Sequence, residues 1–399
     1  MATNSASLSQ QQRVFYVIVI AQFCGTSLWF AGNAVLPQLQ AAYGWPVSAL
    51  GYLTSSTQLG FIAGTLIFAA LGLADRFQPS KLFFVSSLAA GAFNLLALID
   101  ISSYPLVLVS RCLTGIFLAG IYPVGMKIAA DWQAEGLGHW LGALVGALVL
   151  GTAFPYSLKL VPQLVQPSIL LVVISTLCVA GAVMLLVYVP DGPYRKRASA
   201  FSLAAMGKIF RNDTLRASAI GYFGHMWEVY AYWAFVPFIV MHYQEVTQRH
   251  FQPSLVCFLI IASGAAGCVM GGIWSFRIGS FRVAAYALLA SGLCCLLSPF
   301  MWHLPLWLFI LFTVFWGVTV AADSPQFSAL VARNAPDQLR GSAITLVTSI
   351  GFCITIASIQ LISYAQQFIP AQYLFLVLVP GPLIGVLSLV KFVRPAPAR

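Results

Sequence analysis

Residues 105–130 read PLVLVSRCLTGIFLAGIYPVGMKIAA, and residues 305–330 read PLWLFILFTVFWGVTVAADSPQFSAL. Each stretch is apolar over more than the roughly 20 residues that a helix needs to cross a bilayer. Each nevertheless carries a charged residue in its interior, Arg111 in the first and Asp323 in the second. A charge at the centre of a membrane helix costs about 2.5–3.5 kcal/mol. The two stretches therefore indicate membrane helices whose charged side chains serve a function.

Similar apolar runs recur along the whole chain of 399 residues, which is 60% hydrophobic and 8% charged. Soluble globular proteins carry about 25% charged residues. The runs are longer than barrel strands and apolar on all sides, so they predict an all-α membrane protein rather than a barrel. We predict twelve spans, at 14–36, 50–73, 81–101, 105–130, 140–158, 168–189, 217–241, 254–275, 283–301, 305–330, 342–365 and 373–389.

The formal net charge of +10 alone would suit a nucleic-acid partner. The basic residues, however, follow the predicted spans. With the N-terminus in the cytoplasm, only Lys159 and Arg249 of the 20 Lys and Arg lie in outside loops. This is the positive-inside bias of a membrane protein. We therefore expect a multi-pass protein of the cytoplasmic (inner) membrane with both termini in the cytoplasm, and no nucleic-acid partner.

The longest polar interruption runs from Pro190 to Arg216, with the linker at 194–216, and leaves six predicted spans on each side. We expect residues 1–193 and 217–399 to form two six-helix halves, joined by a cytoplasmic linker. Within this linker, residues 201–210 have the pattern of a short amphipathic helix on the membrane face.

The halves carry matching residues at matching spacing. Three pairs lie the same number of residues apart: Gly115 and Gly317, Ala119 and Ala321, and Pro123 and Pro325. Two basic pairs are one residue closer: Arg76 with Arg277, and Lys81 with Arg282. This agreement indicates duplication of a six-helix unit. Transporters built from such parallel repeats place their binding site between the halves, near the bilayer midplane.

With these motifs the chain resembles the major facilitator superfamily over its full length. The family signature after helix 2 has the form Gly-x-x-x-Asp-Arg-x-Gly-x-(Arg/Lys)-(Arg/Lys), and Asp75, Arg76 and Lys81 match it. The helix 4 signature, Arg-x-x-x-Gly, matches Arg111 and Gly115. The resemblance implies a fold of twelve helices in two pseudo-symmetric halves, transport by alternating access, and a monomer.

The resemblance also implies a cytoplasmic gate around the helix 2–3 signature and its second-half copy. The expected gate residues are Asp75, Arg76, Lys81, Asp131, Arg277 and Arg282. Asp131, at the end of helix 4, stands where the family has an acidic partner for the signature. We interpret Lys127, four residues before Asp131, as its ion-pair partner.

In this family, helices 1, 4, 7 and 10 line the central cavity. Polar and aromatic residues in these four helices recur three or four positions apart, so each set falls on one helix face. From these faces we predict that the substrate is bound by Gln22, Thr26, Trp29, Asn33, Arg111, Tyr122, Tyr232 and Gln326.

Three titratable residues on the same faces are predicted to couple transport to protons: Glu228, His225 and Asp323. Glu228 lies near the middle of the seventh span, and intramembrane acids are functional by default. The alternative for Glu228 is a structural hydrogen bond. Asp323 lies just before Pro325, which removes a backbone donor and can open the tenth helix locally. The alternative for Asp323 is therefore structural: a proline kink that is solvated by a cytoplasmic cavity. Arg111 stays charged and serves coupling, an anionic substrate or structural pairing.

The sequence thus predicts a proton-coupled secondary transporter of a small organic solute, with uptake by symport favoured over drug or metabolite export by proton antiport. Aromatic walls with few charges suit an organic molecule. A receptor is a more distant alternative, because the chain lacks a sizeable soluble domain. No catalytic triad, phosphate loop or nucleotide fingerprint points to an enzyme. The expected partners are the solute, protons and the lipid bilayer, with no cofactor and no metal.

Overall fold

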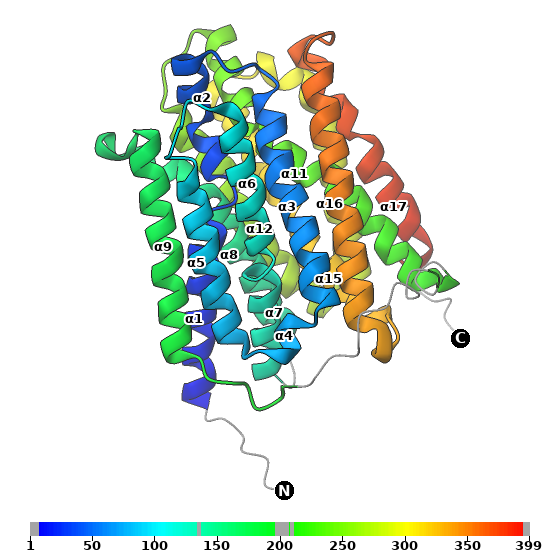
Figure 1. The fold of residues 1–399 in the computed structure, drawn as a ribbon. Helices are drawn as coiled ribbons and strands as arrows, with labels where there is room; N and C mark the ends of the chain where they lie inside the picture. Colours follow the sequence, from blue (N-terminus) through cyan, green and yellow to red (C-terminus); the bar gives the residue numbers. More distant parts are fainter. Residues whose placement is uncertain (1–7, 134–136, 196–206, 208–210, 394–399) are drawn as a thin grey trace, which may run out of the picture.

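The computed structural model describes residues 8–133, 137–195, 207 and 211–393. Over these residues the chain forms helices and no strands, in a single bundle whose members run roughly alongside one another (Figure 1). The all-α fold is therefore confirmed. Most of the 201–210 segment, for which we predicted an amphipathic helix, lies outside the described residues.

Nine α-helices form the first half of the bundle: α1 (Leu8–Thr26), α2 (Ala31–Tyr43), α3 (Ala49–Ala70), α4 (Leu73–Arg76), α5 (Pro79–Leu96), α6 (Tyr104–Leu118), α7 (Tyr122–Trp132), α8 (Leu137–Leu158) and α9 (Pro167–Tyr188). The second half contains α11 (Asp213–Thr247), α12 (Pro253–Ile278), α13 (Ser280–Leu297), α14 (Leu306–Ala322), α15 (Ser324–Asn334), α16 (Arg340–Ala365) and α17 (Pro380–Val393). Four short 3-10 turns connect them: η1 (Pro162–Leu164), η2 (Ser298–His303), η3 (Asp337–Leu339) and η4 (Ala371–Leu378).

Prolines begin many of these helices. The first turns of α5, α6, α7, α9, α12 and α15 all contain one. A helix has no partner for its first N–H groups, so a residue without an N–H loses nothing there, and its fixed φ suits the helix. Proline thus sets where these apolar helices start.

Ten helical segments among the described residues are long and apolar enough to cross a membrane. Some are continuous, such as Pro253–Ile278, and others are interrupted, such as Tyr104–Trp132 and Leu306–Asn334. The helices α5 and α11 run through the bundle beside these ten (Figure 1). Counting them gives an arrangement consistent with the twelve predicted spans.

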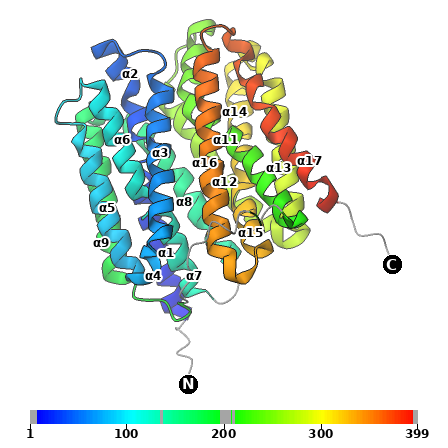
Figure 2. The ribbon, with the colours of Figure 1, turned by 45° about the vertical axis from the view of Figure 1, so that its right-hand side comes forward.

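The chain folds as two groups of helices that lie side by side. In Figure 2 the blue-to-teal helices of the first half occupy one side, and the lime-to-red helices of the second half the other. The halves meet where α8 packs along α12 and α3 packs along α16. At the first contact, a Cβ added to Gly146 would lie 3.5 Å from the Ala265 carbonyl oxygen, which is ordinary van der Waals distance. The contact between α8 and α12 would therefore accommodate an alanine at Gly146.

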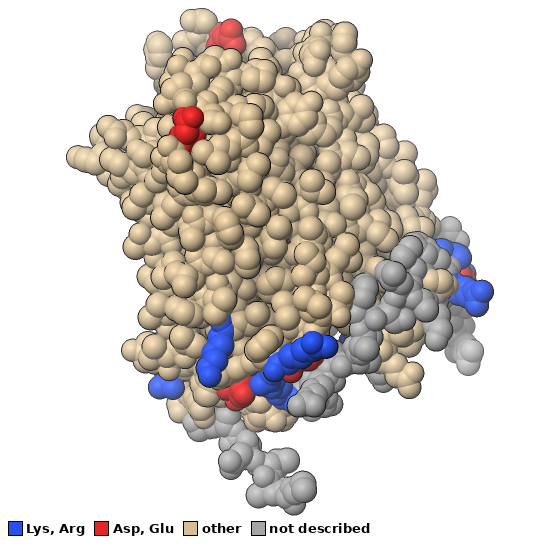
Figure 3. All heavy atoms as spheres, viewed as in Figure 1, with Lys and Arg blue, Asp and Glu red and all other residues tan. Residues whose placement is uncertain are grey.

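Charge divides the two ends of the bundle. In Figure 3, Lys and Arg gather at the end where the N-terminus leaves, which we call the basic end, and acidic residues are visible at the opposite end. The broad surface between them is almost free of charge in this view. Such an uncharged belt is what contact with lipid requires, since charges are costly in the hydrocarbon region.

Candidate functional site

Three helices predicted to line the cavity are interrupted near their middles. Helix 1 is divided into α1 and α2 by residues 27–30, and helix 4 into α6 and α7 by residues 119–121. Helix 10 is divided at Asp323, between α14 and α15. The prolines Pro123 and Pro325 lie in the first turns of α7 and α15. Breaks of this kind free backbone polar groups inside the bundle, where they need partners.

Arg111 supplies partners at the helix 1 break. Its guanidinium donates to the carbonyl oxygen of Leu28 (3.1 Å), to Thr114 Oγ1 (3.1 Å) and to the side-chain oxygen of Asn94. The aliphatic part of the side chain packs on Gly32, where an added Cβ would lie 2.8 Å from Arg111 Cδ. Arg111 is buried, and no acidic side chain among the described residues forms an ion pair with it. Its positive charge is balanced by carbonyl and hydroxyl dipoles.

His225 and Asp323 lie within ion-pair distance of each other inside the second half, and they form an ion pair when the imidazole is protonated. His225 Nδ1 on α11 lies 2.8 Å from Asp323 Oδ1, at the break of helix 10. Both side chains are almost fully buried. Removing either partner would leave the other as an isolated buried polar or charged group, which is strongly unfavourable. The pair therefore ties α11 to the junction of α14 and α15.

Glu228 lies one turn from His225 and faces two other helices of the same half. Its Oε1 accepts a hydrogen bond from Trp316 Nε1 (2.7 Å), and its Oε2 accepts one from Ser291 Oγ (2.8 Å). The Cys295 thiol is 3.3 Å from Oε1. The carboxyl is fully buried. Glu228 thus accepts hydrogen bonds from both α13 and α14, and donors of this kind bond best to a carboxylate.

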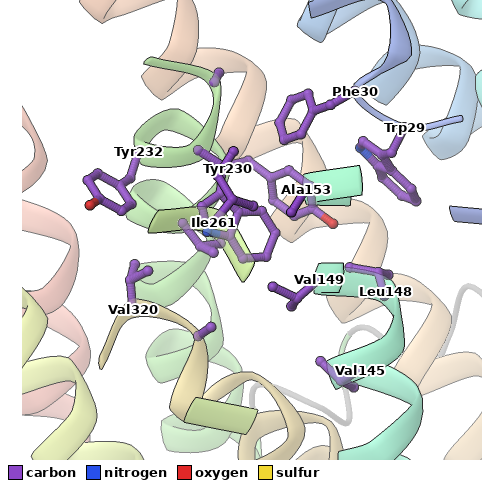
Figure 4. Packing of buried hydrophobic residues seen from close by; sticks show 14 of the residues in the cluster. Trp29, Phe30, Val145, Leu148, Val149, Ala153, Tyr230, Tyr232, Ile261 and Val320 are labelled. Carbon is purple, nitrogen blue, oxygen red and sulfur yellow. The ribbon is translucent and has the colours of Figure 1, made fainter. Parts of the chain in front are cut away.

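Aromatic side chains connect the two halves at the centre of the bundle. Trp29 lies 5.7 Å from both Tyr230 and Phe352, and Phe61 lies 4.6 Å from Phe352, measured between ring centroids. Figure 4 shows Tyr230 pointing from α11 toward the α8 residues, whereas Tyr232 points to the other side of α11. Rings at these separations attract one another beyond simple burial, so this cluster closes the centre between the halves.

A small cavity lies next to the aromatic cluster, with a volume of about 30 Å³. Its walls come from both halves and include Tyr122 of α7, His225 of α11 and Ser328 of α15. His225 therefore lies both in the ion pair with Asp323 and in the wall of the central cavity. A cavity of this size admits a water-sized occupant but no organic molecule.

The other residues predicted to bind substrate are distributed around this centre. Trp29 belongs to the aromatic cluster, and Asn33 Nδ2 donates to Thr54 Oγ1 (2.7 Å). Thr26 Oγ1 donates to the carbonyl oxygen of Gln22 (2.8 Å), while the Gln22 side-chain amide is buried without a hydrogen-bond partner among the described residues. Tyr232 donates to the Thr313 carbonyl oxygen (2.7 Å). Gln326 is buried in the first turn of α15.

Comparison with known proteins agrees with this architecture. A family model described as Major Facilitator Superfamily matches residues 18–359. The chain belongs to the major facilitator superfamily. The solved structure of the human organic anion transporter MFSD10 (TETRAN) matches with a TM-score of 0.72 at 17% identity, covering 95% of this chain and 99% of that chain. No curated protein sequence is similar enough to match. Membership makes the chain a multi-pass membrane transporter rather than an enzyme.

The residues expected at the gate of this transporter lie at the basic end. Lys127 is 4.0 Å from Asp131, the expected partner, but only 2.9 Å from Asp75 of α4. The segment after α9 also docks here: the Tyr194 N–H donates to the Asp131 carbonyl oxygen (3.0 Å), and Arg195 donates to that of Phe77 (2.7 Å). These contacts join the ends of helices 2, 4 and 6.

The remaining gate residues are more exposed. Arg76, Lys81 and Arg277 are exposed, and Arg282 Nε donates to the Val393 carbonyl oxygen (3.4 Å). The contacts that join the ends of helices 2, 4 and 6 therefore stay within the first half, and the Arg282 contact stays within the second half.

Several site residues were missed by sequence reasoning. Asn94, Ser291 and Trp316 hold the buried charges, but each lies in an apolar run where nothing in the sequence distinguishes it from a packing residue. No group of three or more His, Cys, Asp or Glu within the described part of the chain is arranged to hold a metal ion.

Proposed function

We propose that this transporter couples the movement of a small organic solute to protons, with uptake by symport. The observation that carries the proposal is the double position of His225, in the wall of the central cavity and 2.8 Å from Asp323. A group that faces the solute path and also pairs with a buried acid can respond to both solute and proton.

The coupling follows from the electrostatics of the pair. Charged His225 and Asp323 attract each other strongly in buried surroundings. A proton that neutralises Asp323 removes this attraction and frees His225 toward the cavity. Because Asp323 lies at the break between α14 and α15, the same proton weakens the hold of α11 on that break. Glu228, one turn away, is proposed to receive or deliver the proton.

Alternating access requires the two halves to move relative to each other. The central cavity is too small for an organic solute, so the aromatic cluster must separate for binding. We propose that the halves rock on the contacts of α8 with α12 and of α3 with α16. The Lys127–Asp75 pair and the docked Arg195 would then act as the cytoplasmic gate.

We place the basic end in the cytoplasm, with both termini there, in the cytoplasmic (inner) membrane. The concentration of Lys and Arg at one end of the bundle (Figure 3) supports this orientation. A monomer is proposed as the transporting unit, because each half already supplies helices to the central cavity.

The solute is proposed to be organic because the cavity walls are mainly aromatic and apolar. An anionic group would suit the buried cation Arg111, which we propose to serve substrate binding or coupling. The similarly folded human protein is an organic anion transporter, which makes organic anions the first class to test.

The test uses purified protein in liposomes containing a trapped pH dye, exposed to membrane-impermeant organic anions, cations and zwitterions. We expect inward movement of a solute to carry protons into the lumen, and expect Asp323→Asn and His225→Gln to abolish the proton signal. Asp100→Asn, an exposed acid outside the bundle core, is the matched control. Solute transport without proton movement would refute the coupling. Protons leaving as the solute enters would establish the antiporter instead.

A further inference from the structure

A second, larger cavity opens at the end of the bundle opposite the basic end. Its volume is about 600 Å³, and its walls come from α2 and α8 of the first half and from α11 and α12 of the second. We call it the vestibule. Its wall is mostly apolar and includes Pro37, Pro237 and Met241. The volume lies in the range of known sites for small organic ligands.

Lys159 is the only Lys or Arg among the residues that line the vestibule. Its ammonium donates to the Ala34 carbonyl oxygen (3.0 Å) and to Gln38 Oε1 (3.2 Å). An ammonium carries three donors, and both of these acceptors are uncharged. No carboxylate of the described residues lies within ion-pair distance of Lys159. The charge is therefore held in position by α2 without being neutralised.

Tyr156, one helical turn before Lys159, also lines the vestibule. The residue is only 3% exposed, and its hydroxyl has no hydrogen-bond partner among the described residues. A buried hydroxyl without a partner is unfavourable by about 1–3 kcal/mol. This free donor belongs to the same wall as the ammonium and therefore marks a place for an acceptor group that the protein itself does not supply.

We propose that the vestibule is a capture site for a small organic anion, in which Lys159 and the Tyr156 hydroxyl bind the anionic group and the apolar wall holds the rest of the molecule. This inference rests on the proposed function, for which it names the substrate class. The site lies between the halves on the outer side, so a solute bound there stands at the start of the path to the centre.

The electrostatics of Lys159 support this assignment. Partial burial lowers the pKa of Lys159, because poorly solvating surroundings disfavour the charged ammonium. An anion bound beside it restores the stability of the charged form. Glu245, the one acid in the vestibule wall, has a largely exposed side chain and lies 3.8 Å from His242. Its charge is therefore directed to solvent at the rim and opposes an anion only weakly.

The experiment measures binding rather than transport, so its failure is distinct from failure of the proton coupling. Benzoate and benzenesulfonate carry one negative charge beside an apolar ring, and benzamide carries none. Purified full-length protein in detergent is titrated with each, and the shift in its melting temperature is followed. We expect both anions to stabilise the wild type and benzamide to have little effect.

The variants locate the site. Lys159→Gln should weaken anion binding at least tenfold, and Tyr156→Phe several-fold, whereas Lys159→Arg should retain most of it. Arg249→Gln removes the other basic residue predicted outside, which does not line the vestibule, and should bind like the wild type. Equal stabilisation by benzamide and benzoate would overturn the proposal. Undiminished anion binding to Lys159→Gln would also overturn it, as would a loss of anion binding in Arg249→Gln equal to that in Lys159→Gln. The unliganded melting temperature of each variant shows that it is folded.

Discussion

Arg111 Nη1 donates a hydrogen bond of 3.1 Å to the carbonyl oxygen of Leu28, at the point where helix 1 is interrupted. The two residues lie 83 positions apart in the chain. The carbonyl oxygen left free in one helix thus accepts a hydrogen bond from the buried guanidinium of another. The bond offsets the loss of hydration of both groups. This relationship gives Arg111 a structural task whatever part it also plays in transport.

Replacing Arg111 should therefore destabilise the fold. Arg111→Ala leaves the Leu28 carbonyl and Asn94 without their donor, and we expect a loss of about 1.5–3 kcal/mol in the free energy of unfolding. Arg111→Lys should lose less, because an ammonium can keep one of the three bonds. Thermal unfolding in detergent measures both, with the exposed Arg277→Ala as control. A stable Arg111→Ala variant that only loses anion binding would instead assign Arg111 to the substrate.

Substitutions of Glu228 can separate its contribution to folding from its proposed role in proton coupling. Glu228→Gln keeps an oxygen to accept from Trp316 and should change the free energy of unfolding by less than about 1 kcal/mol. It cannot bind and release a proton, so the pH dependence of transport should flatten. Glu228→Ala leaves Trp316 and Ser291 without an acceptor and should unfold at clearly lower temperature. If Glu228→Gln transports with unchanged pH dependence in liposomes, Glu228 carries no proton and its hydrogen bonds are its whole role.

Gly115 and Gly272 should respond in opposite ways to the same added methyl group. A Cβ at Gly115 would collide with the Thr57 carbonyl oxygen and lie 3.0 Å from the Phe61 nitrogen, both on α3. Because neither backbone can yield easily, Gly115→Ala should destabilise by about 1–3 kcal/mol. At Gly272 nothing lies within 4 Å, so alanine should be neutral or stabilise by up to about 1 kcal/mol. Melting temperatures of the two variants test the close contact of α3 and α6.

The basic end provides a test of which acid pairs with Lys127. A double-mutant cycle of Lys127→Met with Asp75→Asn should give a coupling energy of about 0.2–1 kcal/mol, as expected for a partly exposed pair. The same cycle with Asp131→Asn should give less, because that carboxylate is 4.0 Å rather than 2.9 Å away. Thermal unfolding of the single and double variants supplies both values. A larger coupling to Asp131 would restore the pairing within helix 4 that the sequence suggested.

Much of the site could be located from the sequence, but its pairings could not. Periodicity placed His225, Glu228 and Asp323 on helices that do meet in the second half, because residues three or four apart share a helix face. It did not indicate that His225 pairs with Asp323 or that Glu228 faces Trp316. Those partners come from other helices, and their rotation about the helix axis depends on packing.

The helix 1 break was likewise missed. Residues 14–36 read as one uninterrupted span, whereas α1 ends at Thr26 and α2 begins at Ala31. The tenth helix carried a local signal, Pro325, and does break just before it. Helix 1 has no proline at its break, and Arg111 takes up the Leu28 carbonyl from a distant part of the chain.

Hydropathy and charge along the chain were enough to predict that it crosses a membrane, how its spans are ordered and which end carries the basic residues. These properties depend on local hydrophobicity and on the charge of each loop, which need no knowledge of the fold. The packing of the helices selects the partners of Arg111, Lys127 and Glu228, and it brings Tyr156 and Lys159 to the wall of a vestibule between the halves. In a low-dielectric interior every buried polar group must find a partner nearby, and which groups are nearby depends on how the helices pack.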